Sequence, residues 1–222
     1  MPVMQSRSIL AFCLLSHVLG CAAVHAASGF LQTRGQDIVD TNGQKVLLRG
    51  VGLGNWLLPE GYMWKFGSNG DRPRKIEKLI AELVGEEKAE QFWQTFRRNY
   101  ITEADIQRIA ELGFNSVRPA LNARLFMAEG GNPTMIEKNF ELLDNLVEWC
   151  RTHNVFIIID MHGAPGGQSR LFTADPDGGA RLWTSGDHQE RTVELWQILA
   201  ERYFYEQDGA QVINRQISIK QG

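Results

Sequence analysis

The sequence has 222 residues, of which 43% are hydrophobic, 22% charged and 9% aromatic, with a formal net charge of -3. This composition is that of an ordinary folded domain and excludes a disordered, collagen-like or polytopic membrane chain. A slightly acidic chain lacks the clustered Lys and Arg that DNA or RNA binding requires, so we expect no nucleic-acid partner. Three cysteines are too few for a disulfide scaffold or a cysteine-rich zinc site.

The N-terminal segment has the layout of a secretory signal peptide. One basic residue, Arg7, precedes an apolar run over residues 9–20, and small residues follow. The run is too short to span a bilayer, which needs about 20 apolar residues. We expect a signal peptide over 1–26 and a secreted, periplasmic or extracellular mature chain over 27–222, with no integral membrane segment. A lipid anchor on Cys21 is the second interpretation, because Val-Leu-Gly-Cys resembles a lipoprotein box.

The mature chain is expected to begin with a hairpin and a buried strand. Residues 37–50 have the pattern of a hairpin with Asn42-Gly43 as its turn. Residues 47–54, LLRGVGLG, have that of a first buried strand. Two helices, over 72–85 and 86–100, are expected to decorate the long loop that follows this strand.

A helix and a short strand are expected next. Thr102 opens the helix with a Thr-x-x-Asp capping box, and Gly113 stands where a left-handed cap would end it. The inner face of this helix is marked by Ile106, Ile109 and Leu112. Residues 114–121 are predicted to form a strand that Pro119 stops.

A second helix and strand pair follows, and a third helix closes the ordered part. The helix is expected over 136–152, where Cys150 continues an apolar stripe and is interpreted as a core residue. The strand over 155–161, VFIIIDM, is apolar on both faces, which is typical of a parallel sheet covered on both sides. A glycine-rich loop over 162–186 then leads into a helix over 187–206.

The alternation of strands and helices predicts an α/β fold. Right-handed parallel crossovers allow an open doubly wound sheet or a barrel, and polar residues at the carboxyl ends of the strands favour the barrel. A complete (β/α)8 TIM barrel takes about 250 residues, so we expect one truncated to about its first three to four βα units. Such an open barrel leaves strand edges unpaired, and we expect poor solubility or dimerisation.

Three predicted strand ends carry polar residues in an otherwise apolar setting. They lie in the segments GVGLGNWLLPEGY, NSVRP and DMHGAPGGQ. Their polar and aromatic side chains are Asn55, Trp56, Glu60, Arg118, Asp160, His162 and Gln168. Because the carboxyl ends of parallel strands meet at one edge of a sheet, these side chains are expected to converge on a site.

Together these segments resemble glycoside hydrolase family 5, the cellulase and exo-glucanase family with a (β/α)8 barrel. Gly-Asn-Trp-Leu-x-Pro-Glu, Asn-Ser-Val-Arg-Pro and Asp-Met-His-Gly-Ala-Pro-Gly-Gly-Gln follow in the family's order over about Lys45 to Tyr205. The last segment is most similar to the β-glucosidase and exo-1,3-glucanase branch. The resemblance implies a glycosidase that acts on β-glucosidic bonds of a β-glucan or β-glucoside and needs no cofactor.

The resemblance also implies roles for individual residues. Glu60 matches a carboxylate that holds sugar hydroxyls in the -1 subsite, and His162 matches a histidine that lines the same subsite. Arg118 matches an arginine that keeps the nucleophile ionised, since a fixed positive charge lowers the pKa of a neighbouring carboxyl group. Trp56 and Trp183 are available as sugar-stacking platforms.

Retaining glycosidases also need an acid/base and a nucleophile carboxyl group, about 5–5.5 Å apart. In the family these are the Glu of an Asn-Glu-Pro at the end of strand four and a Glu at the end of strand seven. Neither is present here: after Glu206 the sequence is QDGAQVINRQISIKQG. The resemblance therefore implies a hydrolase truncated before both catalytic glutamates. The alternative is a catalytically dead fragment or a weak sugar-binding remnant.

Other interpretations of the same residues stay open. The simplest alternatives are that His162 is a loop histidine whose hydrogen bonds are made within the protein, and that Glu60 is a solvated loop residue. Asp160 is expected to orient its loop through hydrogen bonds to backbone amides. A metal-dependent hydrolase using Asp160 and His162 is a further possibility, but the sequence has no His-x-His or His-Glu-x-x-His motif, so we expect no metal. Three further tryptophans are expected in the core, namely Trp93, Trp149 and Trp196.

Overall fold

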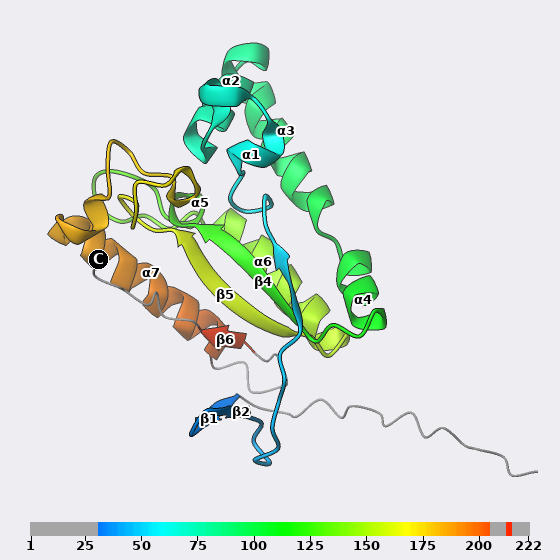
Figure 1. Ribbon diagram of the computed structural model, residues 1–222. Helices are drawn as coiled ribbons and strands as arrows, with labels where there is room; N and C mark the ends of the chain where they lie inside the picture. Colours follow the sequence, from blue (N-terminus) through cyan, green and yellow to red (C-terminus); the bar gives the residue numbers. More distant parts are fainter. Residues whose placement is uncertain (1–30, 205–211, 215–222) are drawn as a thin grey trace, which may run out of the picture.

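The computed structural model describes residues 31–204 and 212–214. The expected signal peptide over 1–26 and its Cys21 lie outside the described residues. A four-stranded parallel sheet in the order β3-β4-β5-β6 forms the centre of the molecule (Figure 1). Its strands are β3 (Gly50–Leu53), β4 (Ser116–Asn122), β5 (Phe156–Gly163) and β6 (Val212–Asn214). The predicted α/β class with a parallel sheet is therefore confirmed.

Seven α-helices are described between or beside these strands. They are α1 (Gly61–Trp64), α2 (Pro73–Val84), α3 (Glu86–Tyr100), α4 (Glu103–Glu111), α5 (Ala123–Phe126), α6 (Glu137–Thr152) and α7 (Gly186–Phe204). Short 3-10 turns cover Gly67–Gly70, Phe172–Ala174 and Arg181–Trp183. The predicted helices over 72–85, 86–100 and 136–152 are confirmed within one or two residues. No helix in the described part of the chain has the length and apolar character that crossing a membrane requires.

The hairpin before the sheet differs from the one predicted. Strand β1 (Gln32–Arg34) pairs antiparallel with β2 (Asp37–Val39), so the main pairing lies on the N-terminal side of β2. The predicted turn at residues 42–43 does form, and the Asp40 carboxylate accepts the backbone N–H groups of Asn42 and Gln44. It closes only a single bridge, Val39 to Lys45. The turn was predicted correctly, but the strand after the turn was predicted to be longer than it is.

The ends of α4 follow the predicted signals. The Asp105 carboxylate accepts the Thr102 backbone N–H at 2.8 Å and forms the expected capping box. Gly113 has φ +82°, in the left-handed region that favours glycine. Of the predicted inner face, Ile106 is fully buried, but Leu112 is 58% exposed because it is already the C-cap residue of the helix.

Pro119 does not stop its strand, contrary to the prediction. Strand β4 continues through it to Asn122, with Pro119 opposite Leu53, where β3 ends. On the other side no register partner in β5 is assigned to Arg118 or Pro119, although pairing resumes at Ala120. The fixed φ of proline is compatible with extended backbone, so a strand can pass through it at the cost of a missing donor.

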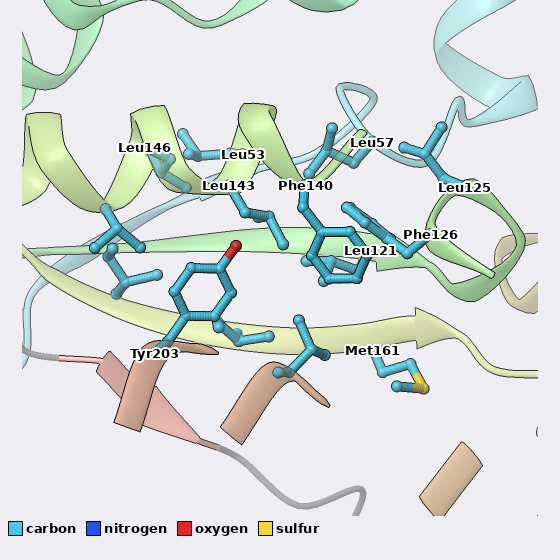
Figure 2. Close-up of a cluster of buried hydrophobic side chains, with 14 of the residues drawn as sticks. Leu53, Leu57, Leu121, Leu125, Phe126, Phe140, Leu143, Leu146, Met161 and Tyr203 are labelled. Carbon is cyan, nitrogen blue, oxygen red and sulfur yellow. The ribbon is translucent and has the colours of Figure 1, made fainter. Parts of the chain in front are cut away.

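The two faces of the sheet have different environments. Side chains that alternate along β4 and β5 enter a hydrophobic core against α6 and α7, as Figure 2 shows for Leu121 and Met161. Phe140, Leu143 and Leu146 come from α6, and Tyr203 comes from α7. The predicted core residue Cys150 is 1% exposed, and burial raises the pKa of its thiol to about 12. The opposite face of the strands carries the polar side chains.

Gly61 brings two loop segments into close contact. A Cβ at Gly61 would lie 2.3 Å from the backbone oxygen of Asp71. We expect Gly61→Ala to lower the free energy of unfolding by about 1–3 kcal/mol, because backbone cannot yield as a side chain can. Gly186→Ala is the matched control, since a Cβ there would meet nothing within 4 Å. Equal urea midpoints for the two variants would contradict the prediction.

Candidate functional site

Three charged or titratable side chains of β4 and β5 meet on the polar face of the sheet. The Asp160 Oδ2 oxygen lies 2.6 Å from a guanidinium nitrogen of Arg118 and 2.9 Å from Nδ1 of His162. The side chains of Arg118, Asp160 and His162 are 40%, 21% and 32% exposed. The structure thus brings together two residues that the sequence singled out, Arg118 and His162.

Asp160 has a different role from the one predicted. Its carboxylate binds the Arg118 and His162 side chains rather than backbone amides. Burial acts to raise the pKa of Asp160, but the hydrogen bond with His162 and the charge of Arg118 outweigh it and hold that pKa below its usual value. The group is therefore an anion at neutral pH, which keeps the cationic arginine in place.

Glu60 is held beside the end of β3. It is 8% exposed, and its backbone N–H donates to Oδ1 of Asn55 at 3.0 Å. A Cβ on Gly54 would lie 2.9 Å from Oε1 of Glu60, and a Cβ on Gly52 would lie 3.9 Å from Nη1 of Arg118. Oε1 of Glu60 and Nη1 of Arg118 thus both lie near the segment at the end of β3.

Helix α1, which follows Glu60, adds an aromatic side chain that the sequence analysis missed. Tyr62 is 61% exposed, and its hydrogen bond with the Glu60 carboxylate raises the pKa of the phenol. Its ring lies 6.5 Å from the ring of Phe172, edge to face. Phe172 belongs to the loop between β5 and α7 and is 37% exposed. Both rings come shortly after strands, Tyr62 in α1 after β3 and Phe172 in the loop after β5, and this position was the available signal.

The two predicted stacking tryptophans have opposite environments. Trp56 is 1% exposed, and its Nε1 donates to the backbone oxygen of Arg97 at 2.7 Å. It is a core residue with no free face for a sugar, so that prediction is wrong. Trp183 is 38% exposed, and its Nε1 donates to the backbone oxygen of Gln168 at 2.7 Å. Its role as a platform stays a prediction. Trp93 is buried, and Trp149 and Trp196 pack against the core as expected.

A buried carboxylate anchors the loop between β5 and α7. Asp175 is 3% exposed and accepts hydrogen bonds from Nδ2 of Asn122 at 2.9 Å and from Nε of Arg124 at 2.5 Å. Its other oxygen accepts the backbone N–H of Arg74 at 3.0 Å. Arg124 also pairs with Glu77 at 2.6 Å. This network joins α2, the end of β4 and the loop that carries Trp183, and no local sequence pattern marked it.

The chemistry of the Asp160 and His162 pair favours a polar ligand over a metal ion. A guanidinium already contacts the Asp160 carboxylate, and its positive charge opposes a cation at the same oxygen. Across the residues that the structure describes, no group of three or more His, Cys, Asp or Glu side chains is placed to hold a metal. The cluster can instead donate from Arg118 and accept at Glu60, a combination that suits hydroxyl groups.

Comparison with known proteins identifies the family of the chain. The model of the cellulase family, glycosyl hydrolase family 5, matches residues 82–213. The chain is 34% identical over 176 residues to a beta-xylosidase of Phanerodontia chrysosporium, covering 78% of this chain and 36% of that protein. It is 36% identical over 172 residues to a probable glucan 1,3-beta-glucosidase A of Emericella nidulans, covering 75% and 41%.

A solved structure shows the same arrangement of elements. The rutinosidase from Aspergillus niger superposes with a TM-score of 0.62 at 19% identity, covering 75% of this chain and 47% of that one. The sheet and its helices therefore share the fold of that structure. The chain belongs to glycosyl hydrolase family 5, and it spans less than half the length of each of these relatives.

Proposed function

We propose that this chain is part of a secreted glycosidase that hydrolyses the β-glucosidic bonds of glucans with retention of configuration. The observation that carries the proposal is the cluster of Arg118, Asp160 and His162 on the polar face of two parallel strands. The buried Glu60 carboxylate follows the neighbouring strand β3. Membership of family 5 supports hydrolysis, and the similarity to glucan 1,3-beta-glucosidases supports a β-linked glucan as substrate.

The geometry supports a division of roles among the binding residues. The Glu60 carboxylate can accept hydrogen bonds from sugar hydroxyls, and the Arg118 guanidinium can donate them. Trp183 and Phe172 expose ring surface in the loop that follows β5, which suits the C–H face of a pyranose. These residues would form the binding part of the site and need no cofactor.

The proposed domain organisation is a signal peptide over residues 1–26 followed by the first three to four βα units of a (β/α)8 barrel over 27–222. The order β3-β4-β5-β6, each strand parallel to the next, supports this arrangement. The sequence contains no Asn-Glu-Pro motif, so the acid/base glutamate would be absent from these 222 residues. In a chain with only three to four βα units, the nucleophile glutamate of strand seven would be absent as well. The second candidate function is therefore a weak sugar-binding remnant.

The two candidates are distinguished by measuring binding and hydrolysis separately. We expect the purified chain to bind laminaribiose, a β-1,3-linked glucose disaccharide, and to leave an aryl β-glucoside unhydrolysed. Arg118→Ala should weaken binding about tenfold or more, because a charge-assisted donor is lost. Arg151→Ala, on the far end of α6, is the control and should bind as the unmodified chain does. Hydrolysis above background would contradict the assignment of a chain without catalytic glutamates, and equal binding by all three proteins would contradict the site.

A further inference from the structure

One oxygen of Asp160 receives two side chains. The Arg118 nitrogen that lies 2.6 Å from Oδ2 of Asp160 also lies 3.4 Å from Nδ1 of His162. Nδ1 itself lies 2.9 Å from the same Asp160 oxygen. An ionised carboxylate can only accept, so the hydrogen of the shorter contact must be on Nδ1. A nitrogen that carries a hydrogen cannot also accept one from Arg118, so the arginine donates to Asp160.

This arrangement determines the state of the other histidine nitrogen. In a neutral imidazole one ring nitrogen carries the hydrogen and the other accepts. A carboxylate that accepts from one ring nitrogen therefore leaves the other ring nitrogen as an acceptor. The same relation holds for histidines that a carboxylate orients in metal sites. In His162, Nδ1 donates to the Asp160 carboxylate, and Nε2 is the nitrogen that can accept a hydrogen bond.

We propose that Asp160 is a positioning residue that holds His162 in its Nδ1–H tautomer, so that Nε2 accepts a hydrogen bond from a sugar hydroxyl. The identity of the ligand in this proposal rests on the proposed function, whereas the tautomer assignment does not. A hydroxyl that donates to Nε2 keeps its lone pairs free, and these can accept from the Arg118 guanidinium. Asp160 would thus set the direction of the hydrogen bonds without touching the sugar.

The fold supports this role for Asp160. Asp160 and His162 are two residues apart in β5, so both side chains project from the same face of the strand. The register places Ala120 of β4 opposite Asp160, which leaves room for the Arg118 side chain to reach it. The lowered pKa of Asp160 keeps it ionised at neutral pH, as an acceptor for both neighbours must be.

The tautomer can be read directly by nitrogen NMR of the full chain with 15N-labelled histidine at alkaline pH. His162→Gln identifies the signals of His162 by their loss. In the unmodified chain we expect Nδ1 of His162 to be the protonated nitrogen and Nε2 the unprotonated one. In Asp160→Asn we expect the two nitrogens to exchange character in a large share of molecules, because the amide can offer its N–H to Nδ1.

A matched control separates this effect from the general loss of a carboxylate. Asp144→Asn removes another aspartate that binds an arginine, Arg202 at 2.6 Å, far from the strand ends. It should leave the His162 signals unchanged. A protonated Nε2 in the unmodified chain, or the same His162 tautomer in Asp160→Asn, would overturn the proposal. The first of these readouts uses only His162→Gln, to identify the signals, and does not depend on whether Asp160→Asn folds.

Titration with laminaribiose distinguishes failure of the inference from failure of the proposed function. We expect Asp160→Asn to bind about tenfold more weakly than the unmodified chain, and Asp144→Asn to bind equally well. If the tautomer changes as expected but no protein binds laminaribiose, the proposed ligand is wrong and the tautomer assignment stands. If binding occurs but Asp160→Asn binds equally well, the positioning role is wrong.

Discussion

Replacing Asp175 by alanine is expected to lower the free energy of unfolding by about 3–5 kcal/mol, among the largest effects of any single substitution in this chain. The side chain of Asp175 is 1% exposed and accepts from Arg124, Asn122 and the Arg74 backbone. Removing the carboxylate leaves these donors buried without their acceptor. Burial opposes the charge on Arg124, but Glu77 and Asp175 outweigh it and raise the pKa of Arg124 above its ordinary value.

Asp175→Asn should cost less than Asp175→Ala. The residue has φ 47°, in the left-handed region, which asparagine tolerates better than alanine. The amide oxygen can also still accept from one donor. Urea unfolding followed by far-UV circular dichroism measures both variants. The control is Glu82→Ala, which removes an exposed carboxylate 3.6 Å from Lys78 on α2 and should move the midpoint very little. Similar midpoints for Asp175→Ala and Glu82→Ala would contradict the anchor role.

Elements with a strong periodic pattern could be predicted from the sequence. The helix over 136–152 was predicted correctly because its apolar positions repeat with one clear period, and the strand over 155–161 because it is a short continuous apolar run. The end of strand β4 was predicted wrongly, because the strand continues through Pro119. The missing N–H of proline is tolerated where the neighbouring strand does not need a hydrogen bond from that residue. Local sequence patterns therefore predict that a helix or strand exists more reliably than they predict the residue at which it ends.

The site could be predicted only in part, for a physical reason. The motifs identified Arg118 and His162, and strand alternation places Asp160 on the same face as His162. The contact between Asp160 and Arg118 depends on the register of β4 against β5, which no local pattern states. The burial of Trp56 depends in the same way on α3, whose Arg97 carbonyl accepts its N–H from 41 residues away. Partners distant in the chain decided both outcomes.

The second large effect on the free energy of unfolding is expected in α6, which covers the face of the sheet opposite the site. Phe140 of α6 is fully buried, its ring lies 5.1 Å from that of Phe126, and the Arg202 guanidinium lies 5.2 Å from the ring centre. Phe140→Ala should lower the free energy of unfolding by about 3–5 kcal/mol, because it removes this packing and leaves a cavity between α6 and the sheet (Figure 2). The readout is the urea midpoint at constant slope.

The same variant tests whether the binding side chains depend on the core beneath them. Phe140 packs on the covered face of the sheet, whereas Arg118 and Asp160 contact one another at its other face. We therefore expect Phe140→Ala to retain laminaribiose binding at temperatures where it stays folded, while Arg118→Ala keeps its stability and loses binding. Leu83→Ala, at a site 68% exposed on α2, is the control and should change stability by less than about 0.5 kcal/mol. A folded Phe140→Ala that no longer binds would show that the two faces are coupled through the strands, and the strand ends could not then be treated as a rigid frame for the site.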